Sequence, residues 1–325
     1  MNGKSRGSLE AVVNCLQRED RITIIGHSIP DGDCVGACLG MGLALENLGK
    51  RVSIVLTDPI PAIYSYLKGQ HLLTPTEKLS EGGVLLYLDC ADQERTGALP
   101  PAFIAGAKLV INIDHHISNS GFGDYFLVQP EAASACEICL LVLDALGLIP
   151  NMEIANALYT GIIMDTGSFL YSSVTPQTMR AAARLLEYGA DKDLIRQALF
   201  ETKSWTEMQV LRLTLQSLRF NKERTVGWSA LTRKELIDIG AENLHFEGII
   251  NYIRNIEGVE VAILFREMAD SKVKIGFRSR GKADVNKIAD IWGGGGHRLA
   301  AGASISGTMS QVVSQVTARV DEFLS

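Results

Sequence analysis

Continuous runs of apolar residues, rather than alternating ones, mark the first part of the chain. Four such runs, each short enough for a single strand, lie at residues 21–27, 51–58, 82–89 and 108–114. Uninterrupted apolar runs are typical of strands that are covered on both faces. Small and apolar residues at helical spacing follow the first run and predict a helix that closes on Gly49. The pattern therefore predicts a parallel sheet with helices on both of its faces.

The apolar spacing becomes helical from residue 132 to about residue 218. The last of these stretches, residues 191–218, is long, polar on one face and poor in strand-forming residues, which suits a helical connector. Strand-like runs and helical patterns then follow at 225–232, 248–256, 259–268, 272–279, 284–292 and 310–324. We predict an α/β protein with an N-terminal parallel-sheet domain over 1–190, a helical connector over 191–215 and a smaller mixed α/β domain over 216–325.

Length and composition narrow the class of protein. A chain of 325 residues, of which 46% are hydrophobic and 21% charged, suits a globular protein of two domains. It has neither an apolar run long enough to cross a membrane nor the apolar core of a signal peptide, so we expect no membrane partner. The net charge of −6 excludes a general basic surface for long nucleic acid. Six cysteines scattered among apolar residues favour the reducing cytoplasm, and Cys136 and Cys139 are expected to be buried packing residues.

Carboxylates and imidazoles follow the ends of the predicted strands. They are His27, Asp31, Asp33, Asp89, Asp114, His115 and His116, and the helical stretch 152–166 adds Asp165. The carboxyl ends of parallel strands meet at one edge of a sheet, so these side chains are expected to converge there. So many carboxylates repel each other and are costly to desolvate unless cations neutralise them.

The donor types indicate which cations these are. Aspartate and histidine without cysteine suit Mn²⁺ or Mg²⁺ better than structural zinc. More donors are present than one ion needs, and two ions about 3.5–4 Å apart serve phosphoryl chemistry. Any one cluster taken alone is also compatible with ordinary surface polarity, because acidic loops commonly follow strands. Their joint occurrence at successive strand ends favours a metal site.

Several motifs carry a family resemblance. HSIPDGD at 27–33, LDCAD at 88–92, DHH at 114–116 and GIIMDTG at 161–167 resemble the four motifs of the DHH phosphoesterase superfamily. GFRSRGKADVNKIADIWGGGGHRLAAGA at 276–303 resembles its associated C-terminal domain with a GGGH motif. In length and C-terminal motif the chain is most similar to the bifunctional oligoribonuclease and pAp phosphatase family, the nanoRNases.

The resemblance implies two sets of metal ligands. One ion would be held by His27, Asp31, Asp89 and Asp165, and the other by Asp33, Asp89, His115 and Asp165, so that Asp89 and Asp165 bridge. Mn²⁺ would be preferred, with Mg²⁺ or Co²⁺ as substitutes. Asp114 would orient a histidine ligand, and His116 would face the substrate phosphate and protonate the leaving oxygen. The chain has Ser134-Ala135 where family members often carry Ser-Thr, which is a departure from the family.

Basic residues gather in the second predicted domain. Residues 271–298 carry seven Lys and Arg against two Asp, although each of them alone is compatible with a solvated charged face. Gly293–Gly296 followed by His297 would let backbone N–H groups approach an anion, with a flexible turn as the alternative. By resemblance, the nucleotide and phosphate contacts would be Arg278, Ser279 and His297, with Arg280, Asn286, Gly294, Gly295 and Gly296 beside them.

The leading functional hypothesis is Mn²⁺-dependent hydrolysis of short RNA to mononucleotides and of 3'-phosphoadenosine 5'-phosphate (pAp) to AMP. A small basic patch suits a substrate of a few nucleotides, because affinity for long strands scales with phosphate contacts. A linear or cyclic dinucleotide phosphodiesterase (of the pGpG, pApA or c-di-AMP type) is the close alternative. A manganese pyrophosphatase, a processive exonuclease and a non-catalytic nucleotide-binding regulator are disfavoured, the last because a binder does not need six metal ligands. The sequence is compatible with either a monomer or a homodimer.

Overall fold

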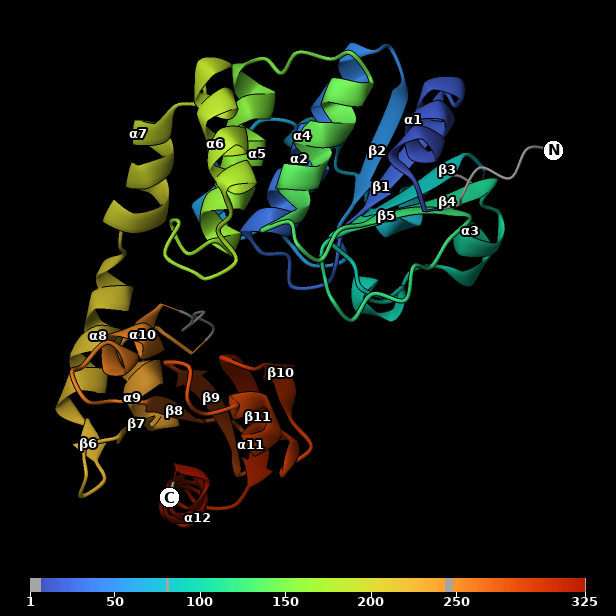
Figure 1. The fold of residues 1–325 in the computed structure, drawn as a ribbon. Coiled ribbons are helices and arrows are strands. Elements are labelled where there is room, and N and C mark those ends of the chain that lie inside the picture. The colour runs from blue at the N-terminus through green and yellow to red at the C-terminus, as the bar shows by residue number, and fades with distance from the viewer. Residues whose placement is uncertain (1–6, 80–81, 243–247, 325) are drawn as a thin grey trace. The chain divides into compact units, whose positions relative to one another are not determined.

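A computed structural model describes residues 7–79, 82–242 and 248–324 (Figure 1). Contacts divide the chain into two compact units, Met1–Thr202 and Lys203–Ser325. Among the described residues, no helix has the length and apolar character needed to span a bilayer.

The first unit is built on a parallel sheet of five strands in the order β2-β1-β3-β4-β5. The strands are β1 (Arg21–Ile25), β2 (Arg51–Val55), β3 (Val84–Leu88), β4 (Leu109–Asp114) and β5 (Tyr125–Val128). The four apolar runs form β1 to β4, as predicted, and every residue of β3 is buried. Because β1, β3 and β4 are neighbours, the residues that follow them leave the sheet side by side.

Helices and loops cover both faces of this sheet, which confirms the predicted layering. The helices are α1 (Leu9–Arg18), α2 (Gly32–Asn47), α3 (Pro101–Ala105), α4 (Ala135–Ala145), α5 (Met152–Asp165), α6 (Pro176–Glu187) and α7 (Lys192–Arg196). One face packs Leu86 and Leu88 against α1, α2, α4 and α5 in the larger core. The opposite face packs Leu85 and Tyr87 against Phe103 of α3. The six cysteines are free and buried, as expected for packing residues.

Glycines let α2 and α5 approach each other closely. A Cβ atom added at Gly36 would lie 2.4 Å from the backbone oxygen of Ala157. A Cβ atom at Gly161 would lie 2.8 Å from Asp33 Oδ1 at the start of α2, and 2.2 Å from Cys136 Sγ of α4. Larger residues would hold these backbones apart. The close approach matters because α2 begins, and α5 ends, at the carboxyl edge of the sheet.

The stretch predicted as one long helical connector is interrupted. Helix α7 continues into a π-helical turn, Gln197–Glu201, and the chain is extended at Thr202. Helix α8 (Trp205–Gln216) then begins anew. Ser204 caps it, because the Ser204 hydroxyl accepts from the Glu207 N–H while the Glu207 carboxylate accepts from the Ser204 N–H. This capping box breaks a helical pattern that the apolar spacing alone did not separate.

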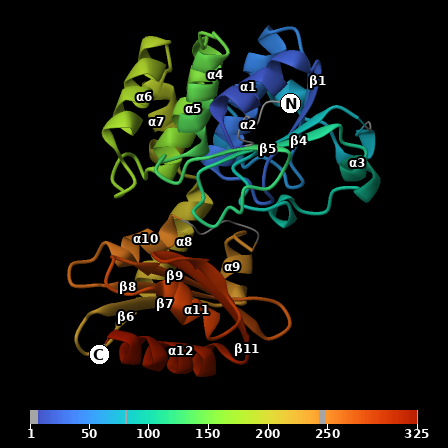
Figure 2. The ribbon, with the colours of Figure 1, turned by 45° about the vertical axis from the view of Figure 1, so that its right-hand side comes forward.

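The second unit is a mixed sheet of six strands in the order β10-β11-β9-β8-β7-β6, in which only β7 and β8 pair in parallel. The strands are β6 (Arg219–Phe220), β7 (Val226–Leu231), β8 (Val261–Glu267), β9 (Lys272–Ser279), β10 (Gly295–His297) and β11 (Ala300–Ser306). The remaining helices are α9 (Arg233–Asp238), α10 (Ile249–Arg254), α11 (Val285–Asp290) and α12 (Met309–Leu324). Helices α11 and α12 pack on one face of the sheet and α8 and α10 on the other (Figure 2).

Candidate metal centre

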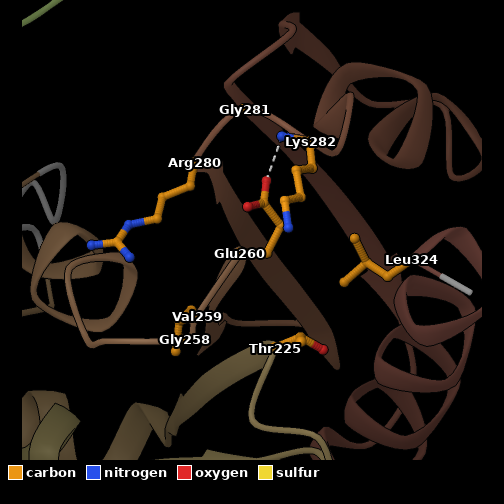
Figure 3. Close-up of a pocket in the computed structure, with 8 residues that line it drawn as sticks. All are labelled: Thr225, Gly258, Val259, Glu260, Arg280, Gly281, Lys282 and Leu324. Carbon is orange, nitrogen blue, oxygen red and sulfur yellow. Dashed lines mark hydrogen bonds between the residues drawn. The ribbon is translucent and has the colours of Figure 1, made fainter.

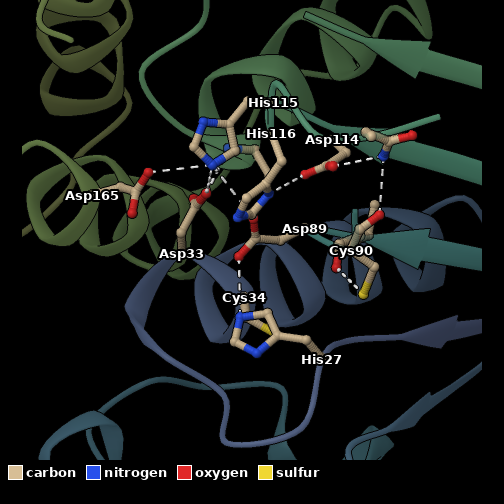
Figure 4. A network of polar contacts seen from close by, with 12 residues as sticks. His27, Asp33, Cys34, Asp89, Cys90, Asp114, His115, His116 and Asp165 are labelled. Carbon is tan, nitrogen blue, oxygen red and sulfur yellow. Dashed lines mark hydrogen bonds and ion pairs between the residues drawn. The ribbon is translucent and has the colours of Figure 1, made fainter. Parts of the chain in front are cut away.

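Residues from three neighbouring strand ends and two helix ends meet at the carboxyl edge of the first sheet (Figure 4). His27 follows β1, Asp89 follows β3, and Asp114 ends β4 directly before His115 and His116. Helix α2 brings Asp31 and Asp33 at its start, and α5 brings Asp165 as its last residue. All eight residues predicted for this edge of the sheet thus come from elements that end there.

Asp89 lies between two imidazoles and presents a different oxygen to each. Its Oδ2 is 3.4 Å from His27 Nε2, and its Oδ1 is 3.5 Å from His115 Nε2. The side chain is 3% exposed, and within the described residues Oδ1 has no hydrogen-bond partner. The Asp89 backbone is left-handed (φ 57°), a conformation that costs a non-glycine residue energy and recurs at functional sites. A buried carboxylate with an unsatisfied oxygen between two histidines suits a bridging metal ligand.

His27 is held in the orientation that a metal ligand needs. Its Nδ1–H donates to the carbonyl oxygen of Ser28 over 2.8 Å, which leaves the Nε2 lone pair directed at the acidic cluster. Asp31 Oδ1 lies 3.6 Å from that Nε2. The same oxygen caps α2, because it accepts from the N–H groups of Asp33 and Cys34.

His115 faces three carboxylates. Besides Asp89, its Nε2 lies 3.3 Å from Asp165 Oδ2 and 3.8 Å from Asp33 Oδ2. The Asp33 carboxylate is fixed by the first turn of α4, where the backbone N–H groups of Ala135 and Cys136 donate to it over 2.6 and 3.0 Å. A helix N-terminus stabilises a carboxylate through these N–H groups and its dipole. Ala135 therefore contributes its backbone at the point where the chain departs from the Ser-Thr pattern.

The electrostatics show that the cluster is short of positive charge. Burial and the neighbouring Asp89 raise the pKa of Asp33 to about 7, and burial and Asp33 raise the pKa of Asp165 to about 8. Burial alone would lower the pKa of His115, but the nearby carboxylates of Asp89, Asp33 and Asp165 raise it to about 10. The pKa of Asp89 moves down in spite of burial, because His115 and His27 hold its charge. Protons are thus retained where bound cations would otherwise supply the charge.

The donor set fits divalent cations. Three overlapping groups of donors each lie within 4.8 Å of one another: Asp89, Asp114, His115 and His116; His27, Cys34 and Asp89; and Asp33, His115 and Asp165. Aspartate and histidine dominate, as Mn²⁺ and Mg²⁺ sites require. Cys34 was not among the predicted site residues, yet its thiol lies close to His27 and Asp89 (Figure 4).

His116 is engaged by Asp114 instead of pointing its Nδ1 at a metal. Its Nδ1–H donates to Asp114 Oδ1 over 2.7 Å, whereas the distance from Nδ1 to Asp89 Oδ1 is 3.5 Å (Figure 4). Asp114 is fully buried, and although burial opposes its charge, hydrogen bonds from His116 and Asn119 lower its pKa. We expected Asp114 to orient a histidine ligand; the structure pairs it with His116, not with His115. Asn119, three residues after His116, was not among the predicted site residues.

The predicted substrate contacts lie in the second unit. In the strand register, Ala300 of β11 pairs with His297 of β10 on one side and with Arg278 of β9 on the other. Directly paired residues point to the same face of a sheet, so Arg278 and His297 share a face. Ser279 is buried and its hydroxyl donates to Glu260 over 3.1 Å, so that this hydroxyl serves the interior of the domain. Gly294 precedes β10, Gly295 and Gly296 lie in it, and Asn286 lies in α11.

A pocket of about 550 Å³ also lies in the second unit, lined by Thr225, Gly258, Val259, Glu260, Arg280, Gly281, Lys282 and Leu324 (Figure 3). Its wall is tied together by Glu260 Oε1, which accepts from the N–H groups of Lys282 and Ala283. Arg280, a predicted substrate contact, and Lys282 contribute two cations to its lining. It contains none of the predicted metal ligands.

Comparisons with known proteins agree with both units. The family model of the DHH family N-terminal domain matches residues 21–162, and the model of the DHHA1 domain matches residues 230–325. A bifunctional oligoribonuclease and PAP phosphatase NrnA from Thermus thermophilus is 35% identical over 94% of this chain and 91% of its own length. The protein of the same name from Bacillus subtilis is 28% identical over 90% and 92%.

Two further relatives extend the comparison. A cyclic-di-AMP phosphodiesterase PdeA from Listeria monocytogenes is 25% identical over 98% of this chain, which spans 50% of that protein. The crystal structure of an exopolyphosphatase-related protein from Bacteroides fragilis superposes with a TM-score of 0.89 at 26% identity, over 96% of this chain and 94% of that one.

Proposed function

Because this chain belongs to the DHH phosphoesterase family and is similar to NrnA proteins over most of its length, we propose that it hydrolyses short RNA oligonucleotides to mononucleotides and pAp to AMP. Membership of this family makes it a hydrolytic enzyme. The substrate proposal is supported by the names of its relatives, which match it over nine tenths of both chains. The single observation that carries the chemistry is the placement of Asp89, with one oxygen toward His27 and the other toward His115.

In this proposal two divalent ions, preferably Mn²⁺, share the centre. The first would be held by His27, Asp31, Asp89 and Asp165, and the second by Asp33, Asp89, His115 and Asp165. The buried, unsatisfied Oδ1 of Asp89 supports this assignment, since a cation would give that oxygen the partner that it lacks. When bound, such ions supply positive charge that stabilises the transition state and lowers the pKa of a water nucleophile.

His116 supplies the proton for the leaving oxygen. Asp114 accepts from its Nδ1 and so fixes the ring, and we assign Nε2 to the substrate. The protein residues thus orient the substrate and deliver a proton, while the carboxylates hold the cations.

We assign catalysis to residues 1–190, substrate binding to residues 216–325, and the connection between them to residues 191–215. Arg278 and His297, which share a face of the second sheet, would bind a phosphate and its nucleotide, with Gly294–Gly296 contributing backbone N–H groups. Substrate discrimination would come from this unit, since it is separate from the centre that cleaves. We also propose a cytoplasmic location, in keeping with six free cysteines.

Product analysis over a substrate panel tests the proposal. The panel contains pAp, pApA, pGpG, c-di-AMP, labelled RNA of two to ten nucleotides and a long single-stranded RNA, each with Mn²⁺ and with EDTA. We expect Mn²⁺-dependent release of mononucleotides from the shortest RNAs and of phosphate from pAp. Preference for c-di-AMP would favour the second candidate, a dinucleotide phosphodiesterase, which the similarity to the Listeria protein supports. Turnover that persists in EDTA, or no turnover of any substrate, would refute the proposal.

A further inference from the structure

Asn119 occupies the centre of a polar network behind the candidate metal centre. The two hydrogens of its Nδ2 serve three acceptors, so that one hydrogen is shared: Asp114 Oδ2 at 2.6 Å, Asn112 Oδ1 at 2.7 Å and the carbonyl oxygen of Cys90 at 3.1 Å. These acceptors belong to β4 and to the segment directly after β3. One side-chain amide thus joins the two strand ends from which Asp89 and the histidines emerge.

The Asn119 side chain is itself fixed from two sides. Its Oδ1 accepts from the N–H of Gly121 over 2.7 Å, and its backbone N–H donates to the carbonyl oxygen of His116 over 3.1 Å. Asn112, which is fully buried, donates to the same Cys90 carbonyl oxygen over 3.1 Å. Both polar ends of the Asn119 amide are therefore used, and rotation of the side chain would break contacts on each.

Asp114 needs this contact because it is a buried carboxylate. Its Oδ1 accepts from His116 and its Oδ2 accepts from Asn119, so each oxygen has one donor. A buried charge without donors is costly, and a carboxylate with one donor can rotate about its Cβ–Cγ bond. The donor on Oδ2 therefore decides where Oδ1 lies, and Oδ1 decides the orientation of the His116 ring.

We propose that Asn119 is a positioning residue for the reaction: it fixes Asp114, and through Asp114 it holds the His116 ring where its proton reaches the leaving oxygen. The proposal rests on the proposed function of His116. Asn119 lies outside both assigned sets of metal ligands, so it acts on the proton donor and not on the cations. The residues before it in the turn, Ile117 and Ser118, are exposed and make no comparable contact among the described hydrogen bonds.

The leaving group of the substrate separates positioning from a structural role. A dinucleotide releases an alkoxide, which needs a proton, whereas the p-nitrophenyl ester of a nucleoside 5'-monophosphate releases nitrophenolate, which does not. We expect Asn119→Ala to lower kcat on the dinucleotide about 10- to 100-fold, as is typical for residues that orient a functional side chain. On the nitrophenyl ester the loss should stay within about threefold, because proton donation no longer limits the rate.

Controls make each outcome decisive. Ser118→Ala, an exposed change in the same turn, should leave both substrates unaffected, and Asn119→Ala should keep the wild-type metal content. Asn119→Asp places an oxygen against three acceptors, so it should impair the dinucleotide reaction more than Asn119→Ala does. Aspartate also keeps the size and shape of the asparagine side chain. Unlike alanine, it therefore leaves no cavity that could unfold the variant. Equal losses on both substrates, or full activity of Asn119→Asp, would overturn the proposal.

The same comparison with His116→Ala separates this inference from the proposed function. Selective loss on the dinucleotide in His116→Ala but not in Asn119→Ala overturns the role of Asn119 alone. Equal loss on both substrates in His116→Ala overturns proton donation by His116, and the role of Asn119 with it. Failure of the wild-type protein to cleave the dinucleotide overturns the proposed function.

Discussion

Replacing Gly36 by alanine tests whether the close contact between α2 and α5 builds the metal centre. The new Cβ would lie 2.4 Å from the backbone oxygen of Ala157 and 3.1 Å from the backbone nitrogen of Gly161. These two atoms belong to one turn of α5, and neither can rotate away as a side chain does. The helices must therefore separate. Asp33 lies at the start of α2 and Asp165 is the last residue of α5, so the separation moves both carboxylates.

The size of the effect follows from that contact. The helices must separate by about 0.6 Å to reach 3.0 Å, the shortest distance that real Cβ atoms show. Overpacking of this kind costs about 3 kcal/mol at the upper end of the usual range. Alanine has a better helix propensity than glycine, which offsets about 1 kcal/mol of this cost. The free energy of unfolding of the first unit should therefore fall by about 2 kcal/mol. Metal sites tolerate errors of about 0.2 Å, so affinity for Mn²⁺ should also fall, by about tenfold or more.

Calorimetric unfolding with and without Mn²⁺ measures both effects. The transition that moves with metal reports the first unit, and it should occur at lower temperature in Gly36→Ala and respond less to Mn²⁺. All three tryptophans, Trp205, Trp228 and Trp292, lie in the second unit, so their fluorescence reports that unit alone. The fluorescence transition should match that of the wild-type protein. Isothermal titration with Mn²⁺ then gives the loss of affinity directly.

Gly40→Ala is the matched control on the same helix. Its Cβ would meet the tip of the Leu158 side chain at 2.8 Å, and that tip can move. We expect a change of less than about 1 kcal/mol in the first unit and unchanged metal affinity, because the strain relaxes without moving either backbone. If Gly36→Ala is as stable as Gly40→Ala and binds Mn²⁺ as tightly as the wild-type protein, the α2–α5 contact does not set the metal geometry.

Three further predictions concern the centre and the substrate unit. Asp89→Asn and Asp165→Asn should each lower the number of bound Mn²⁺ ions and reduce turnover by at least about 100-fold, measured by metal analysis and initial rates; one variant with full activity contradicts bridging. Arg278→Ala and His297→Ala should raise KM or lower kcat/KM about tenfold with metal content unchanged. Loss of metal in either variant would contradict a role in substrate binding alone. Buried Glu137 accepts from a backbone N–H ahead of α4 and from a threonine hydroxyl, both through Oε2. Glu137→Ala removes this acceptor, so it should loosen that segment and weaken Mn²⁺ binding about tenfold in a titration; unchanged affinity would show that Glu137 does not hold the segment in place.

The sequence predicted the first sheet well because its strands are buried on both faces. Short continuous apolar runs are typical of strands that are buried on both faces, and four of the five strands were predicted from them. β5 was missed because only Leu127 of its four residues is buried. In the second unit, β11 (AAGASIS) was missed because alanine, glycine and serine have weak strand preferences, and its place in the sheet comes from pairing with β9.

That aspartates and histidines would gather at this edge of the sheet was predictable for a chemical reason. Few side chains can bind a hard divalent cation, and aspartate and histidine at successive strand ends are rare enough to stand out. The left-handed backbone of Asp89 was not predictable, because it is imposed by the turn between β3 and the rest of the centre. The same holds for the pairing of Asp114 with His116, since neighbouring histidines differ only in where their rings point.

The residues that position the donor side chains were not predicted, because residues of these types occur throughout every protein sequence. Asn119, Glu137 and the N–H groups at the start of α4 act through hydrogen bonds that asparagine, glutamate and backbone amides make in every protein. Their role is set by burial and by hydrogen bonds of 2.6 to 3.1 Å to residues far along the chain, namely Cys90 for Asn119, Thr178 for Glu137 and Asp33 for the start of α4. An Asn119 variant should therefore change the rate, whereas a variant of exposed Ser118 beside it should not. The candidate centre depends on donor residues whose chemistry the sequence reveals, and on positioning residues that only the folded chain brings into contact with them.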